Sequence, residues 1–169
     1  GIFIEISNVP NSIDSNVVWG TKGHGIYEHD STRQIFAHNL VGASEGCGFH
    51  LHGRITDRKM GAEPMVYGAH RVENNIIVSN RLPDDIRGEP SRRVGHAVLQ
   101  GGISFERESW GLRISEDLKL AEVDVVPEGL VDFRGQSRGG PKTIPGPFAD
   151  LPKAPARIAL RSPEAACGE

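Results

Sequence analysis

The 169-residue sequence lacks most of the features that assign a function directly. It contains no Walker, GxGxxG, HExxH, GxSxG or CxxC motif, so it offers no evidence for the functions that these motifs mark. No apolar run approaches the roughly 20 residues that a membrane helix needs. The formal net charge is −3, which gives no electrostatic basis for binding nucleic acid or an anionic membrane. We therefore expect neither of these partners.

Cysteine is also scarce, since Cys47 and Cys167 are the two in the chain, too few for a disulfide framework. The 21 glycines and 11 prolines, by contrast, exceed average usage. This excess predicts many turns and argues against a helical bundle. The chain opens on residues 1–5 (GIFIE), a β-type run with no methionine or polar lead-in. We therefore expect it to be the C-terminal part of a longer protein.

A repeat of about 23 residues runs through the first half of the chain. Asn16, Asn39 and Asn75 recur in similar surroundings at spacings of 23 and 36, so the third copy carries an insertion, placed at about 54–66. Each copy holds short β-type runs and no helix, which favours a parallel β-helix over helical repeats. Stacked rungs would bring the asparagines to one corner, about 4.8 Å apart, with their amides bonded to the next rung. Three unrelated surface asparagines are the alternative.

These patterns predict an all-β fold, the last rungs of a parallel β-helix followed by a cap and a tail. The rungs are expected over 1–82. The segment 83–150 is expected to hold a connecting loop, up to about residue 93, and a small hairpin or cap built from Ile103–Phe105 and Leu112–Ile114. The segment 151–169 is expected to be extended or disordered.

Strand alternation divides the side chains of each rung between two faces. Ile2, Ile4 and Ile6 are uniformly apolar, so we expect them to face the interior. The outward side chains then form two stacked columns, which are Phe3, Tyr27, His50 and Glu5, His29, His52. The edge of this surface, or the adjacent insertion, is expected to hold Asp30, Arg54, Asp57 and Arg58. Glu28 breaks the pattern, which indicates either a strand bulge or a buried carboxylate with a partner.

A surface of this kind suits sugar recognition. Aromatic rings pack on sugar rings, while carboxylates, imidazoles and guanidinium groups bind hydroxyls. A solvated polar face is the simpler alternative. His50 and His52 share one strand face with His29 one rung away, so a three-histidine metal site is a further possibility. Since no carboxylate triad accompanies these histidines, we expect no metal ion and no cofactor.

Several segments resemble β-helical glycoside hydrolases related to β-xylosidases. The segments at 1–6 (GIFIEI), Pro10 and 13–16 (IDSN) are similar to a family rung in which (D/G)-(L/I)-F-x-E-(V/I) precedes G-P-x-x-x-D-x-N. The segment 24–41, from HGIY to AHNLV, and NNIIV at 74–78 resemble later rungs, so the match covers about residues 1–80. The resemblance implies a right-handed β-helix and a retaining glycosidase with Glu5 as the acid/base. It places the nucleophile, an aspartate, one rung upstream of Gly1.

The geometry of a β-helix suits such a reaction independently. Retaining enzymes hold their two carboxyl groups roughly 5–5.5 Å apart, and neighbouring rungs are about 4.8 Å apart. The leading expectation is a fragment of a secreted or cell-envelope glycoside hydrolase, β-xylosidase-like, that binds oligo- or polysaccharides. A polysaccharide lyase with a Lys, Arg or His base, or a non-catalytic carbohydrate-binding β-helix, are the alternatives. The expected substrate-binding residues are Phe3, Tyr27, His29, Asp30, His50, His52, Arg54, Asp57 and Arg58.

Overall fold

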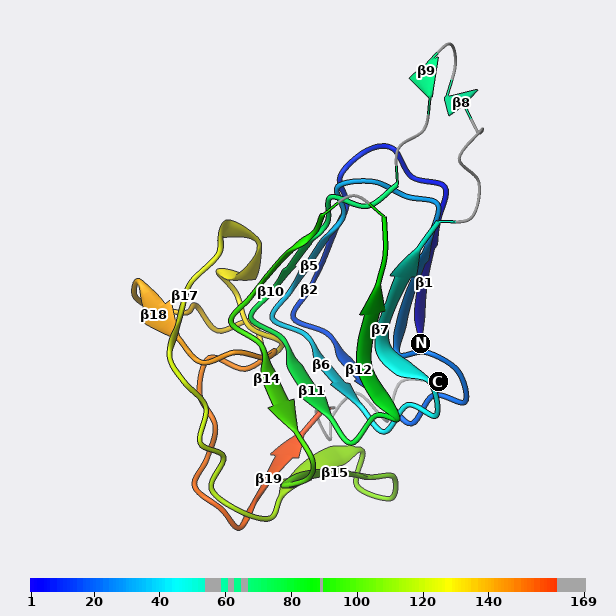
Figure 1. The fold of residues 1–169 in the computed structure, drawn as a ribbon. Helices are drawn as coiled ribbons and strands as arrows, with labels where there is room; N and C mark the ends of the chain where they lie inside the picture. Colours follow the sequence, from blue (N-terminus) through cyan, green and yellow to red (C-terminus); the bar gives the residue numbers. More distant parts are fainter. Residues whose placement is uncertain (54–58, 61–62, 65–66, 89, 161–169) are drawn as a thin grey trace, which may run out of the picture. The chain divides into compact units, whose positions relative to one another are not determined.

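The computed structural model describes residues 1–53, 59–60, 63–64, 67–88 and 90–160 (Figure 1). The chain divides into two units, one comprising Gly1–Leu99 with Leu120–Asp150 and the other Gln100–Lys119 with Leu151–Glu169. Strands dominate both units, and no α-helix occurs among these residues. The predicted all-β class is therefore confirmed.

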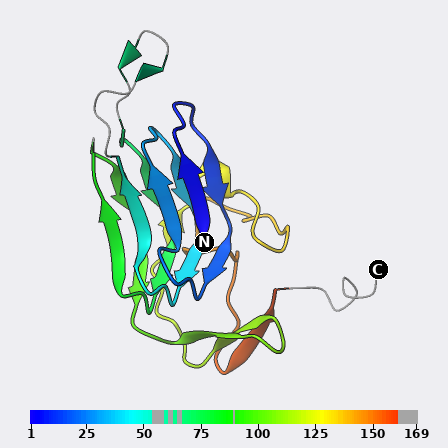
Figure 2. The ribbon, with the colours of Figure 1, turned by 90° about the vertical axis from the view of Figure 1, so that its right-hand side faces the viewer.

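The first unit is built from four successive rungs, each of which contributes one strand to each of three parallel sheets (Figures 1 and 2). Sheet A contains β1 (Ile2–Glu5), β4 (Ile26–His29), β7 (Cys47–His52) and β12 (Leu82–Ile86). Sheet B contains β2 (Ser12–Asp14), β5 (Ile35–Ala37), β10 (Arg71–Glu73) and β13 (Arg92–Val94). Sheet C contains β3 (Val17–Trp19), β6 (Leu40–Gly42), β11 (Ile76–Val78) and β14 (Ala97–Leu99). This stacking of parallel sheets is the arrangement of a β-helix.

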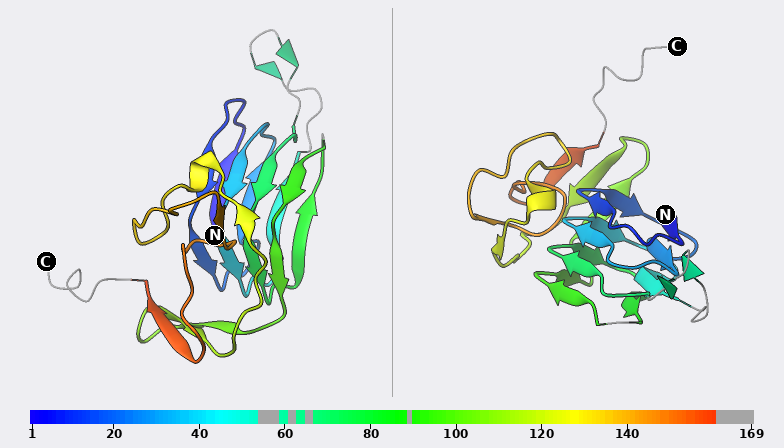
Figure 3. Two further views of the ribbon diagram at one scale, coloured as in Figure 1. Left: turned by 90° about the vertical axis from the view of Figure 1, so that its left-hand side faces the viewer. Right: turned by 90° about the horizontal axis from the view of Figure 1, so that it is seen from above.

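The three sheets share one apolar core. Its members come from all three sheets and are buried: Val18, Ile26, Phe36, Val41, Phe49, Leu51, Val72 and Ile77. Ile2 and Ile4 pack against this cluster, as their position in the alternation predicts. The strands of one sheet follow one another along the stack (Figure 3), so each core position is repeated from rung to rung.

The asparagine column predicted from the repeat is confirmed. The side-chain amide of Asn16 donates to Oδ1 of Asn39 at 3.0 Å, and that of Asn39 donates to Oδ1 of Asn75 at 3.0 Å. Backbone amides follow the same route, since the N–H of Asn16 and of Asn39 each donate to the next asparagine. The backbone N–H of Asn75 continues the column by donating to Nδ1 of His96 at 3.3 Å.

The residue before each member of this column turns the corner in the left-handed conformation. Ser15, His38 and Asn74 have φ between 54° and 57°, and Gly95 has φ 69°. Non-glycine residues adopt this conformation infrequently. Here it recurs on every rung, because the hydrogen bonds of the following residue fix the corner.

The expectation of a connecting loop after residue 82 is wrong. Strand β12 pairs with β7, β13 with β10 and β14 with β11, so the rungs extend to Leu99. The predicted insertion at 54–66 includes a short antiparallel pair, β8 (Lys59–Met60) and β9 (Glu63–Pro64).

The later part of the first unit covers the corner between sheets B and C. It holds β17 (Val123–Asp124), the 3₁₀ turn η1 (Pro127–Gly129) and β18 (Lys142–Thr143). Asn74 donates its side-chain amide to the carbonyl of Asp124 at 2.7 Å and accepts the amide of Gly146 on its own carbonyl at 2.8 Å. The segment is therefore hydrogen-bonded to the rungs.

The second unit is an antiparallel sheet of β15 (Ile103–Glu106), β16 (Gly111–Ile114) and β19 (Ala156–Ala159). The predicted hairpin is confirmed as β15–β16. The expectation of an extended or disordered tail is wrong for Ala156–Ala159, which pairs with β16. Residues 151–155 and 160 of that expected tail form no strand, and residues 161–169 lie outside the described residues.

We predict that Asn39→Ala lowers the free energy of unfolding by about 2–4 kcal/mol, because it leaves the buried partners of one fully enclosed amide unsatisfied. Those partners include the carbonyl of Ile13 and the backbone N–H of Asn16. Asn16→Ala is the matched control at the partly exposed end of the column, and we expect it to cost less than about 1.5 kcal/mol. Urea denaturation followed by circular dichroism measures both. Equal losses of unfolding free energy in Asn39→Ala and Asn16→Ala would show that the asparagine column is not a continuous ladder.

Candidate functional site

The outer face of sheet A carries the two columns predicted from the sequence. Phe3 is in register with Tyr27 and Tyr27 with His50, while Glu5 is in register with His29 and His29 with His52. Strand β12, which the sequence did not predict, adds Asp85 next to His50 in the first column. We use the term outer face of sheet A for Phe3, Glu5, Tyr27, His29, His50, His52 and Asp85.

Aromatic rings stack along the first column. The rings of Phe3 and Tyr27 lie 5.0 Å apart at 18°, and those of Tyr27 and His50 lie 5.4 Å apart at 34°. Tyr27 is therefore covered on both ring faces. Phe3 is 57% exposed and belongs to β1, an edge strand of the sheet. Of these three rings, Phe3 is the one that offers a face to a ligand.

Glu5 lies at the end of the same edge strand. Its side chain is 49% exposed, and its Oε1 lies 3.7 Å from Nδ1 of His29. The same nitrogen lies 3.6 Å from Oδ2 of Asp30. Asp30 itself is 2% exposed, so it does not present its carboxylate to solvent as the sequence predicted. The imidazole of His29 thus lies between one exposed and one buried carboxylate.

The histidines of β7 have lowered basicity. Burial lowers the pKa of His50, and the neighbouring His24 and His52 lower it further, while Asp85 acts in the opposite direction. Burial also lowers the pKa of His52, as does His29. Both imidazoles are therefore neutral at neutral pH, and Nε2 of His52 lies 3.3 Å from the hydroxyl of Tyr27.

Asp85 is held in place by Arg87. The guanidinium donates from Nε and Nη2 to the two carboxylate oxygens at 2.9 and 2.8 Å. These hydrogen bonds lower the pKa of Asp85. Oδ2 of the same carboxylate lies 3.3 Å from Nδ1 of His50. An ionised, oriented carboxylate thus stands behind the imidazole of His50.

Glu28 is the buried carboxylate that the sequence analysis could not pair. It is 0% exposed, and its Oε2 lies 3.2 Å from Nε2 of His70, which is equally buried. Its Oε1 accepts the backbone N–H of Ser31. The Nδ1 of His70 accepts the N–H of Gln34 at 3.2 Å, which places the proton of a neutral ring on Nε2, facing Glu28. Glu28 is therefore part of the interior, and no bulge is needed to explain it.

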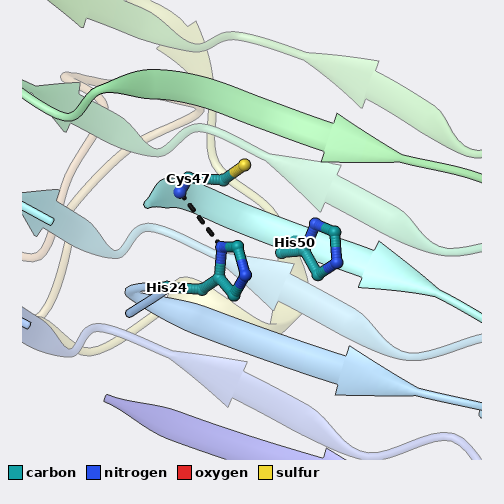
Figure 4. A group of neighbouring side chains, drawn as sticks. All are labelled: His24, Cys47 and His50. Atoms are coloured by element: carbon teal, nitrogen blue, oxygen red, sulfur yellow. Dashed lines mark hydrogen bonds between the residues drawn. The ribbon is translucent and has the colours of Figure 1, made fainter. Parts of the chain in front are cut away.

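A second group of side chains gathers at the start of β4 and β7 (Figure 4). His24, Cys47 and His50 each offer one ligand atom, and the three atoms lie within 4.8 Å of one another. The rings of His24 and His50 stack at 4.1 Å and 10°. The sequence analysis did not single out His24 or Cys47. Their separation of 23 residues, one rung, was the signal that could have placed them side by side.

The remaining predicted residues, Arg54, Asp57 and Arg58, lie outside the described residues. The three histidines considered as a metal site do come together, since the ring centroids of His29 and His52 lie 5.3 Å apart and those of His50 and His52 4.5 Å apart. The set whose ligand atoms meet most closely, within the part of the chain that the structure describes, is nevertheless His24, Cys47 and His50.

Comparison with known proteins gives no match to a family model, a curated protein or a solved structure. A search of the described residues for a helix long and apolar enough to cross a membrane also finds none. The functional argument therefore rests on the geometry of the outer face of sheet A.

We predict that Asp85→Asn lowers the pKa of His50 further, because it removes a carboxylate whose charge raises that pKa. Asp84→Asn is the matched control, since that carboxylate binds Arg93 at 3.1 Å and does not act on His50. Nuclear magnetic resonance titration of the imidazole signals measures both. An unchanged His50 midpoint in Asp85→Asn would contradict the assigned contact.

Proposed function

We propose that the outer face of sheet A binds a carbohydrate, with a sugar ring packed on Phe3 beside Glu5. The observation that carries this proposal is the exposed ring of Phe3 on the outer face of sheet A, beside Glu5 and in register with the rest of the aromatic column. A sugar presents C–H groups to an aromatic face and hydroxyls to polar groups at its rim. Glu5 and His29 provide such polar groups two residues further along β1 and β4.

Within this proposal, Glu5 is the general acid/base of a β-xylosidase-like glycoside hydrolase. Its half-exposed carboxyl group can reach a leaving-group oxygen, and Nδ1 of His29 lies 3.7 Å from its Oε1. A rung paired with the free edge of β1 would set a second carboxylate about 4.8 Å away, near the separation of a retaining pair. The proposal places that nucleophile upstream of Gly1, in a right-handed coil of a secreted or cell-envelope protein. That the β15–β16 hairpin caps the coil also stays a prediction.

The charges on this face favour neutral sugars over uronates. A lyase acting on uronates requires groups that neutralise the substrate carboxylate and a base to remove the proton. Among the described side chains here, Glu5 and Asp85 are acidic, and the nearby Arg87 is bound to Asp85. The histidines of β7 are neutral at neutral pH, as their lowered pKa values require. In a hydrolase Glu5 transfers a proton to the leaving group, whereas in a non-catalytic carbohydrate-binding protein it would only bind sugar hydroxyls.

We predict that xylo-oligosaccharides bind the full chain and that Phe3→Ala weakens this binding at least about tenfold, the loss of one aromatic packing contact of about 1.5 kcal/mol. Val98→Ala is the matched control, an exposed apolar residue on the last rung of the coil. Saturation-transfer difference resonance and calorimetry measure both. Equal binding by Phe3→Ala and the unmutated chain would overturn the proposed sugar position.

Glu5→Gln tests the chemical step in a chain extended by the preceding rung. Loss of a general acid should slow hydrolysis of β-xylosides with poor leaving groups by about 10²–10⁴-fold. Aryl xylosides with acidic leaving groups should lose much less, and added azide should restore their turnover. If both substrate classes react at the unmutated rate, Glu5 is not the acid/base. Binding without hydrolysis in the unmutated extended chain would support the non-catalytic role.

A further inference from the structure

We propose that His24, Cys47 and His50 form a binding site for a borderline divalent metal ion of the Zn²⁺ class. The three side chains meet at the start of β4 and β7, and their ligand atoms already lie within 4.8 Å of one another (Figure 4). Two imidazoles and one thiolate are ligands that Zn²⁺, Co²⁺ or copper prefer, whereas Ca²⁺ and Mg²⁺ prefer oxygen. The ligand set therefore selects the class of metal.

The stacking of rungs creates this site. Strands β4 and β7 pair with Ile26 opposite Phe49, so His24 and Cys47, each two positions earlier, start neighbouring rungs side by side. His50 projects from the outer face of the same strand as Cys47. Ligands from neighbouring rungs of a hydrogen-bonded sheet are held by the backbone, which reduces the entropy lost when a metal binds.

Both imidazoles present lone pairs in the metal-free state. The Nδ1 of His24 accepts the backbone N–H of Cys47 at 3.0 Å, so this nitrogen is unprotonated. The Nδ1 of His50 lies 3.3 Å from Oδ2 of the Asp85 carboxylate, which stands beside the ring. A carboxylate behind a histidine ligand is the arrangement that orients the ring and raises its basicity in many metal sites. Arg87 in turn fixes Asp85.

Metal binding requires small and specific changes. A tetrahedral ion with bonds of about 2.0–2.1 Å to nitrogen and 2.3 Å to sulfur needs ligand atoms about 3.3–3.6 Å apart, so the three side chains must close by about 1 Å through rotation. When the metal binds, Nδ1 of His24 gives up the hydrogen bond that it accepts from the backbone N–H of Cys47 and coordinates the ion. Cys47 loses its thiol proton to solvent and binds as the thiolate. The fourth position is left for water or another small ligand.

This site is distinct from the proposed sugar position. Phe3 and Glu5 are on β1, whereas His24 precedes β4 and Cys47 and His50 lie on β7, so His50 is the one metal ligand that belongs to the outer face of sheet A. The proposal does not depend on carbohydrate binding, and metal binding is measured without any sugar.

The test is a titration of the full chain with Co²⁺ and then with competing Zn²⁺, after chelator treatment and in the presence of a phosphine reductant. We expect one equivalent to bind, with the thiolate-to-cobalt charge-transfer band in the near ultraviolet, and Zn²⁺ to remove that band. Cys47→Ser should abolish the band, and Cys47→Ser and His24→Gln should each weaken binding at least about 100-fold, more than loss of an outer partner costs. Glutamine retains an acceptor for the Cys47 amide, so His24→Gln preserves the fold. Asp85→Asn should weaken binding about tenfold.

Two control variants keep the result specific. His52→Gln removes a histidine from the same strand, and Cys167→Ser removes the other thiol of the chain. Both should bind Co²⁺ as the unmutated chain does, and thermal unfolding by circular dichroism should show every variant folded, with Zn²⁺ raising the melting temperature of the unmutated chain. Absence of binding to the unmutated chain would overturn the proposal. Undiminished binding by Cys47→Ser or His24→Gln, or lost binding in His52→Gln or Cys167→Ser, would also overturn it.

Discussion

The coil depends on how the backbone N–H groups at its corners are satisfied. A parallel coil changes direction between sheets, and the amide before each strand of sheets B and C has no strand partner at that point. A side chain of the next rung accepts it. At the entrance to sheet C these acceptors are Asn39, Asn75 and His96, and at the entrance to sheet B they are Gln34, His70 and Ser91. Because an unsatisfied buried amide is costly, these two columns fix which residue stacks on which.

The composition of the outer face of sheet A follows from that register. A slip of one residue would exchange the faces of a strand and bury its outward side chains. With the register fixed, Phe3, Tyr27 and His50 must stack, and Glu5 must stand beside His29. Glu28 interrupts the apolar alternation of β4, and its Oε2 lies 3.2 Å from Nε2 of His70, which comes from the entrance to sheet B. The corner column therefore places an imidazole beside a buried carboxyl group as well as accepting backbone N–H groups.

The sequence predicted the three-rung register and the outward columns because asparagine recurs visibly at one corner. The fourth rung was not predicted from the sequence, because its corner requires a hydrogen-bond acceptor that need not be asparagine. His96 supplies Nδ1 in place of an amide oxygen, and the spacing from Asn75 falls to 21 residues. It missed β19 because that strand pairs with β16, more than 40 residues earlier, and a local pattern carries no information on such pairing. It missed the contact of His24 with Cys47 because His24 precedes β4 and Cys47 is the first residue of β7, where alternation gives little information.

The same acceptor chemistry separates structural histidines from available ones. His70 and His96 each use Nδ1 to accept a backbone amide from the preceding rung, so their rings are committed to the corners. His24 also accepts an amide, but that of Cys47 on the following rung, and it does so beside His50. Substituting it therefore removes a corner bond of the coil and a ligand at once, unless the new residue keeps an acceptor. His50, His52 and His29 accept no backbone amide among the described contacts, and their register alone places them on the outer face. His29, His50 and His52, which the corners do not need, all lie on sheet A, whose strands include the strand that carries Phe3 and Glu5.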